Sequence, residues 1–245
     1  MTSPDPRSTN APVALITGAS RGIGAATARL FASQGYQLLL LARSGDELEA
    51  LAQELRSSTC RVETSCVDLS DAATIAPKLA ELLSRGLRPT LVINNAGAAY
   101  TGALAEMSLE RWQWLMQLNV TSVLQVCQAT LPALRQGGGQ IINVSSHAAR
   151  HAFPDWGAYC TSKAALASLT RCLAEEERPH GIRVSTLTLG AVNTPLWDTE
   201  TVHSSFDRHA MLTPERVAET LWSLAQQPST QVVEDLTLMP AAGVL

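Results

Sequence analysis

Short apolar segments alternate with longer stretches of helical periodicity along almost the whole chain, and this alternation limits the possible folds more than any other feature. The first apolar segment, 13–17, lacks polar alternation, which is typical of a strand covered on both faces. Strands joined by helices form a mostly parallel sheet, because each right-handed crossover packs its helix on one face. The pattern predicts an α/β fold: a single doubly wound, Rossmann-type domain with about seven strands.

Apolar runs, capping residues and glycines indicate where the elements begin and end. Two helices are expected to begin with side-chain caps, one in a capping box of Ser44 and Glu47 and one at Ser70 or Asp71. Another begins at Pro214, after Thr213. Strands are expected at 13–17, 37–42, 61–67, 90–94, 140–144, 182–187 and 235–238, and further helices at about 22–34, 108–135 and 156–178.

No internal repeat or linker divides the chain. We therefore predict one domain over 13–245, preceded by a polar, proline-containing tail at 1–12 that is expected to be disordered. The segment at about 193–212 has no clear periodicity.

Composition excludes several classes of protein. With 245 residues, 46% of them apolar, the chain can bury a large core and is not a disordered protein. A net charge of -4 leaves no excess of positive charge for nucleic acid, and no apolar run is long enough for a membrane span. The five cysteines lack ligand spacing, as expected of reduced thiols. We expect a cytoplasmic protein with a small-molecule partner, no nucleic acid, no membrane and no metal.

A glycine-containing turn, TGASRGIG, follows the first predicted strand. Gly18, Gly22 and Gly24 let the backbone approach a pyrophosphate, and the N-terminus of the next helix offers it free N–H groups. The alternative is an ordinary tight turn, since the spacing departs from GxGxxG. A strand before the turn and a helix after it favour dinucleotide binding.

The end of the second predicted strand indicates which dinucleotide is bound. Roughly twenty residues beyond the glycine turn, an NAD-binding protein has an acidic residue that binds the ribose 2'-hydroxyl. This chain has Arg43 there and no carboxylate, which favours the 2'-phosphate of NADP(H). Arg21 is a second candidate phosphate ligand, and the alternative is that both arginines are simply solvated.

Tyr159 and Lys163 are four residues apart on a predicted helix, so their side chains share one face. Lowering the pKa of a phenol from about 10 to about 7 requires about 4 kcal/mol. One ammonium about 4 Å away supplies about that much at an effective dielectric constant of about 20. We therefore expect an acid–base pair, although such pairs are more often ordinary surface residues.

The order of these motifs resembles that of the short-chain dehydrogenase/reductase family over essentially the whole chain from Val13. The family's catalytic serine precedes its tyrosine by thirteen positions, which selects Ser146 rather than Ser145. The segments that match the family's motifs are Thr17–Gly24, Asp68, Asn94–Gly97, Asn119, Ser146 and Tyr159–Lys163.

The resemblance implies the site residues, the cofactor NADP(H), and a homodimer or homotetramer. It implies catalytic roles for Asn119, Ser146, Tyr159 and Lys163. It implies cofactor contacts at Gly18, Ser20, Arg21, Gly22, Ile23, Gly24, Arg43, Ser44, Asp68, Leu69, Asn95, Ala96, Gly97, Tyr159, Lys163, Gly190, Val192 and Thr194.

Two segments depart from the family's pattern. Leu189 and Gly190 stand where relatives commonly have Pro-Gly, and the chain ends in MPAAGVL where many have Asp-Gly-Gly. The first change bears on the loop after the sixth strand, and the second on tetramer contacts.

The function implied is NADPH-dependent reduction of a carbonyl compound (a ketone, aldehyde or 3-oxoacyl type) with Tyr159 as general acid. The segment at about 193–212 resembles the substrate lid of the family. Trp197, Val202, Phe206 and Met211 are expected to form an apolar wall of this lid, which suggests a substrate with an apolar portion. Two alternatives remain: an alcohol or hydroxy-acid dehydrogenase working in the oxidative direction, and a non-catalytic nucleotide-binding regulatory protein.

Overall fold

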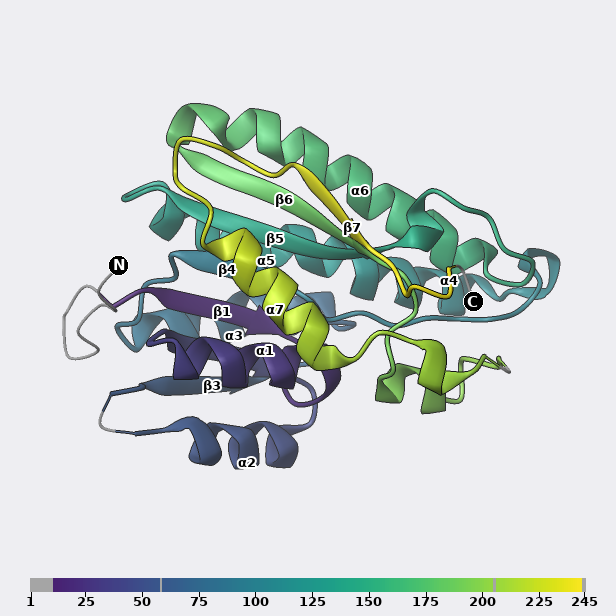
Figure 1. Ribbon diagram of the computed structural model, residues 1–245, viewed down its shortest axis with the longest axis horizontal. Helices are drawn as coiled ribbons and strands as arrows, with labels where there is room; N and C mark the ends of the chain where they lie inside the picture. Colours follow the sequence, from purple (N-terminus) through teal and green to yellow (C-terminus); the bar gives the residue numbers. More distant parts are fainter. Residues whose placement is uncertain (1–10, 58, 205, 244–245) are drawn as a thin grey trace.

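The strands of the computed structural model, which describes residues 11–57, 59–204 and 206–243, form one parallel sheet (Figure 1). Its order within these residues is β3-β2-β1-β4-β5-β6-β7. The chain starts in the middle of the sheet, builds one half outward and then returns to build the other. The strands are β1 (Val13–Thr17), β2 (Gln37–Ala42), β3 (Val62–Cys66), β4 (Leu91–Asn94), β5 (Gly139–Ser146), β6 (Ile182–Leu189) and β7 (Asp235–Leu238).

Helices cover both faces of the sheet (Figure 1). Alternate residues of one strand belong to the two separate cores, as Ile16 and Leu15 of β1 do. This two-sided burial explains why the central strands read as continuous apolar runs. One face carries α1 (Gly22–Ser33), α2 (Gly45–Leu55) and α7 (Pro214–Ala225), and the other carries α3 (Ala72–Ser84), α5 (Ser122–Leu134) and α6 (Gly157–Glu177).

The predicted doubly wound α/β fold is confirmed, and the long helix expected at 108–135 is locally distorted at Asn119, as the family resemblance implies. That segment is α4 (Leu109–Met116), a π-helical turn (Gln117–Thr121) and then α5. The wider turn contains Asn119, whose side chain donates hydrogen bonds to two other segments of the chain. Such a turn depends on partners distant in sequence, so helical periodicity does not reveal it.

The caps follow the prediction at two helices and not at a third. Asp71 accepts from the N–H of Ala73 at the start of α3, and Thr213 accepts from that of Arg216 at the start of α7. Ser44 occupies the cap position of α2, but its side chain makes no capping hydrogen bond, so the predicted capping box does not form.

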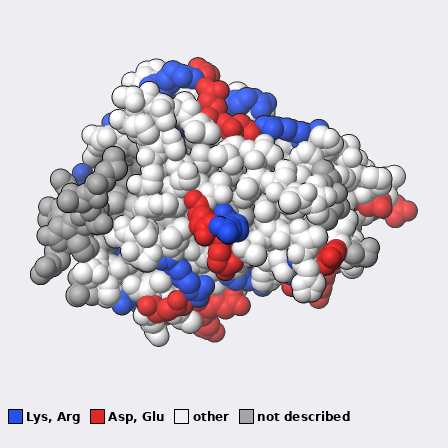
Figure 2. All heavy atoms as spheres, in the orientation of Figure 1, with Lys and Arg blue, Asp and Glu red and all other residues white. Residues whose placement is uncertain are grey.

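Charge is sparse on much of the surface. On the face shown in Figure 2, charged side chains gather along the upper and lower margins and in a small group near the centre, and much of the remaining area is uncharged. Among the described helices, none combines the length and apolarity that crossing a bilayer would require. The predicted disordered tail lies outside the described residues except for 11 and 12.

Candidate active site

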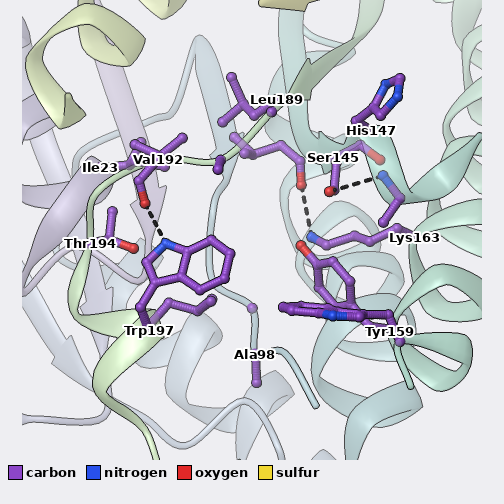
Figure 3. A pocket seen from close by; sticks show the side chains of 18 of the residues that line it. Ile23, Ala98, Ser145, His147, Tyr159, Lys163, Leu189, Val192, Thr194 and Trp197 are labelled. Carbon is purple, nitrogen blue, oxygen red and sulfur yellow. Dashed lines mark hydrogen bonds between the residues drawn. The ribbon is translucent and has the colours of Figure 1, made fainter. Parts of the chain in front are cut away.

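A cavity of about 370 Å³ opens at the carboxyl ends of β4, β5 and β6 (Figure 3). Its lining comes from segments far apart in sequence: the start of α1, the loop after β4, the end of β5, the first turns of α6 and the loop after β6. Several predicted site residues lie there together, namely Ile23, Asn95, Gly97, Ser146, Tyr159, Lys163, Gly190, Val192 and Thr194.

The glycine turn lies beside this cavity, at the point where the strand order reverses between β1 and β4. Gly18 has φ +64°, and a Cβ there would lie 2.9 Å from the Cα of Ala96. A Cβ on Gly24 would lie 2.1 Å from the carbonyl oxygen of Gly18. Neither position accepts a side chain, so both glycines are required by backbone packing.

Thr17 joins the glycine turn to the loop after β4. Its hydroxyl accepts hydrogen bonds from the N–H groups of Asn95 and Ala96, both at 3.0 Å. The Asn95 amide donates back to the carbonyl of Thr17 at 3.0 Å. Thr17 belongs to the matched motif, but the sequence did not single it out as the residue that holds these two loops together.

Asn119 is buried and ties the π-helical turn to two neighbours. Its amide donates to the carbonyl of Ala98 and to the hydroxyl of Ser162, both at 2.9 Å, and its oxygen accepts from the N–H of Ala98 at 2.9 Å. The side chain's hydrogen bonds therefore fix the loop that follows Gly97. Ser162 was not predicted as a site residue.

Tyr159 and Lys163 lie together at the cavity (Figure 3), and Ser146 lines the same cavity. Ser146 is the last residue of β5, while the other two come from one face of α6. The amine of Lys163 lies 5.8 Å from the centre of the Tyr159 ring and donates to the carbonyl of Val144 at 3.1 Å. The predicted proximity on one helix face is confirmed.

The pKa values of this pair differ from the sequence expectation. Burial raises the pKa of Tyr159 above its usual value, and a hydrogen bond with Ser146 only partly opposes this. Burial also lowers the pKa of Lys163 to about 8. The expectation that Lys163 lowers the phenol pKa to about 7 is wrong for the polypeptide alone, because burial has the larger effect on the phenol.

The predicted 2'-phosphate and adenine residues follow the carboxyl ends of β2 and β3, on the side of the glycine turn that faces away from β4. This region is called the rim below. Arg43 follows β2 and is exposed, as is Arg21 at the start of α1. Neither pairs with a carboxylate within residues 11–57, 59–204 and 206–243. Asp68 accepts hydrogen bonds from Ser70. Of the remaining rim residues, Ser44 precedes α2, Ser20 lies within the turn, and the side chain of Leu69 is buried in the core.

Gly190 leaves room for the C-terminal segment. It matches the glycine of the family's Pro-Gly pair, while Leu189 stands in place of the proline. A Cβ on Gly190 would lie 2.6 Å from the Cδ of Pro240 and 3.0 Å from the sulfur of Met239. Met239 also lines the cavity. The two departures from the family's pattern are therefore in contact, and the atypical C-terminal segment forms part of the cavity wall.

The segment predicted to be a lid contributes only part of the expected wall. Trp197 and Phe206 line the cavity, together with Leu196. Val202 and Met211 are buried, 5% and 7% exposed, and do not line the cavity in the described part of the chain. These two residues therefore support the lid from beneath.

Comparison with known proteins identifies the family. The family model described as short chain dehydrogenase matches residues 12–204. The chain belongs to this family. This short-chain dehydrogenase is 32% identical to an uncharacterized oxidoreductase of Staphylococcus saprophyticus over 93% of its own length and 97% of that protein's. It is thus an oxidoreductase of this family, and the motifs identified from sequence fall at the site just described.

Two solved structures are similar to this short-chain dehydrogenase over 94% of its length and 97% of theirs. An alcohol dehydrogenase from the archaeon Thermococcus sibiricus, complexed with 5-hydroxy-NADP, is 32% identical with a TM-score of 0.84. A metagenomic short-chain oxidoreductase in complex with NADP is 31% identical with a TM-score of 0.81.

Proposed function

We propose that this protein reduces the carbonyl group of a ketone, an aldehyde or a 3-oxoacyl compound with NADPH, and that Tyr159 is the general acid. The observation that carries the proposal is the convergence of Ser146, Tyr159 and Lys163 on one cavity, beside a glycine turn that has no room for side chains. This combination places proton donors next to a surface suited to a dinucleotide.

The residues present fit a dinucleotide with a 2'-phosphate. The backbone at Gly18 and Gly24 leaves a close approach open, and the N-terminus of α1 points its N–H groups toward that space. Arg43, without a carboxylate partner among the described residues, is available for a phosphate. The complexes of two similar proteins with NADP or its 5-hydroxy derivative favour the same choice.

When bound, NADPH supplies the hydride that the carbonyl carbon receives. The phenol of Tyr159 carries its proton at neutral pH and donates it to the carbonyl oxygen. The Ser146 hydroxyl donates a hydrogen bond to the same oxygen as negative charge develops there. Lys163, largely protonated below about pH 8, stabilises the phenolate that is left.

A panel of carbonyl compounds tests the proposal. The purified protein is mixed with NADPH or NADH and ketones, aldehydes and 3-oxoacyl thioesters, and loss of absorbance at the nicotinamide band is followed. We expect oxidation of NADPH with at least one compound, and a slower reaction with NADH. Cofactor binding without oxidation, and without reduction of NADP by the matching alcohols, would instead indicate a nucleotide-binding regulatory protein.

A further inference from the structure

Three aromatic side chains form a continuous series along the cavity, and the series starts at Tyr159. Trp156 lies 5.6 Å from the Tyr159 ring with an interplanar angle of 67°. Trp197 lies 5.9 Å from Trp156 at 62°, and Phe206 lies 5.5 Å from Trp197 at 78°. All four residues line the cavity. Ring faces and edges are therefore presented to whatever is bound next to the phenol.

The contacts of this series hold it in place before any ligand binds. The indole N–H of Trp197 donates to the carbonyl of Val192 at 2.7 Å (Figure 3). Asp155, directly before Trp156, has φ +65° and accepts from the N–H of Gly102 at 2.7 Å. A residue other than glycine keeps a positive φ only where the surrounding structure imposes that backbone conformation. A preformed aromatic wall loses little freedom when a flat ring binds to it.

Charge is the second observation, because the cavity offers a single cation among its described lining residues, and this cation, Lys163, lies beside Tyr159. Among the described residues that line it, none is a carboxylate or an arginine, and the basic groups are Lys163 and His147. The amine of Lys163 is held by the carbonyl of Val144. Burial, His151 and Arg150 lower the pKa of His147, so this imidazole is neutral at neutral pH. A carboxylate or phosphate bound along Trp156, Trp197 and Phe206 would lose its hydration without a compensating charge from these three side chains.

We propose that the substrate is an uncharged aldehyde or ketone whose carbonyl is attached to an aromatic ring, and that Trp156, Trp197 and Phe206 hold this ring. The proposal rests on the proposed reduction at Tyr159 and goes beyond it by choosing among its substrate classes. It favours aryl ketones and aldehydes over 3-oxoacyl thioesters and hydroxy acids.

A pair of substrates that differ only in the ring tests the proposal. The ratio of kcat/KM for acetophenone to that for cyclohexyl methyl ketone is measured in the natural protein and in the variants Trp197→Leu and Phe206→Leu. The difference in intrinsic reactivity between the two ketones is the same for all three proteins, so a change in the ratio between proteins reports recognition of the ring. We expect the ratio to fall about tenfold in each variant, which corresponds to about 1.4 kcal/mol.

Val202→Ala is the matched control for loosening of the lid, because Val202 is buried in the same segment and does not line the cavity in the described part of the chain. Its ratio should equal that of the natural protein. An equal fall in Val202→Ala, or an unchanged ratio in both aromatic variants, would overturn the proposal. If none of the carbonyl compounds is reduced, the proposed function itself is wrong, so the two failures are distinct.

Two further measurements address charge and binding. Methyl 4-formylbenzoate should be reduced at least tenfold more efficiently than 4-formylbenzoate, and equal efficiency would contradict the argument from charge. Calorimetry with the amides benzamide and cyclohexanecarboxamide, added to the protein with NADPH, measures ring binding without turnover. Tighter binding of benzamide supports the proposal, and equal binding contradicts it.

Discussion

At the scale of one residue, the buried ammonium of Lys163 is proposed to serve catalysis and lowers the stability of the folded protein. Its ammonium is buried, and the fall of its pKa from 10.5 to about 8 corresponds to a penalty of about 3 kcal/mol on the charged form. The hydrogen bond to Val144 offsets part of this penalty. The buried ammonium therefore makes the folded protein less stable than an apolar side chain of similar size would at this position.

Replacing this lysine should stabilise the protein. We expect Lys163→Met to raise the free energy of unfolding at pH 7 by about 1 to 2 kcal/mol, after the loss of one hydrogen bond. Between pH 8 and 10.5 the unfolded natural protein holds more protons at this site than the folded one, so its stability rises and the difference shrinks. Urea unfolding at pH 7 and pH 9.5 measures both effects. The control is Lys78→Met, which replaces the exposed other lysine of the sequence. It should show neither the gain in stability at pH 7 nor the change between pH 7 and pH 9.5.

Tyr159 is the residue on which the proposed chemistry depends. Tyr159→Phe removes the hydroxyl and keeps the ring that packs against Trp156. We expect kcat to fall by about a factor of 1,000 or more, in the upper range for removal of a general acid, while the dissociation constant for NADPH changes less than about threefold. Stopped-flow kinetics and fluorescence titration check the two parts. Full activity in this variant would remove Tyr159 from the mechanism.

Arg43 decides the proposed choice between the two dinucleotides. Its exposed guanidinium stands at the rim without a carboxylate partner in the part of the chain that the structure describes. We expect Arg43→Asp to raise the KM for NADPH by about tenfold or more, because a bidentate bond to phosphate is replaced by repulsion. The KM for NADH should change little or fall. Equal effects on both cofactors would refute a role in binding the 2'-phosphate.

At the scale of elements, Arg208 holds together the segment 193–212, which is predicted to be a lid. Its guanidinium donates to the side chains of Asn193 and Asp198, at 2.8 and 2.9 Å, and to the carbonyl of Thr194 at 3.0 Å. One side chain thus connects the second half of the lid to the loop that leaves β6. Since Thr194 and Trp197 line the cavity, this contact also positions the cavity wall.

Removing that contact should loosen the lid without unfolding the domain. We expect Arg208→Met to raise the KM of the carbonyl substrate about three- to tenfold and to speed amide exchange across 193–212, since three hydrogen bonds are lost. Hydrogen exchange with mass spectrometry measures the second effect. Arg216→Met, at an exposed arginine of α7 paired with Glu219, is the matched control and should change neither quantity.

Elements whose pattern is local could be predicted from sequence, and those that depend on distant contacts could not. β1 and β2 have their predicted bounds, because continuous apolar runs and flanking turns define them. The π-helical turn at Asn119 depends on hydrogen bonds to Ala98 and Ser162, which only the fold brings close.

The same distinction applies to the site. The motif residues at the strand ends were found because parallel topology gathers those ends at one edge. The raised pKa of Tyr159 and the contribution of Met239 to the cavity follow from burial and from the pairing of β7 with β6. Neither property is local in sequence.

For the whole molecule, the reversal of strand order places the proposed dinucleotide site across both halves of the sheet. Binding there should stabilise the entire domain, because a ligand specific for the folded state adds about 2.7 kcal/mol at a hundred times its dissociation constant. For a domain of this size we expect NADPH to raise Tm by about 5 to 10 °C. Differential scanning fluorimetry with NADPH and, at equal concentration, NADH measures this. A larger rise with NADH would contradict the assigned preference.

The position of Met239 has a practical consequence for anyone who produces this protein. A purification tag or fusion partner attached after residue 245 would follow within a few residues of Met239, a side chain that lines the cavity and lies close to Gly190. Added sequence there can shift that side chain and alter the kinetics assigned to the natural protein. An extension before residue 1 would precede the start of β1, at the amino ends of the strands, whereas the cavity lies at their carboxyl ends, so this is the safer place.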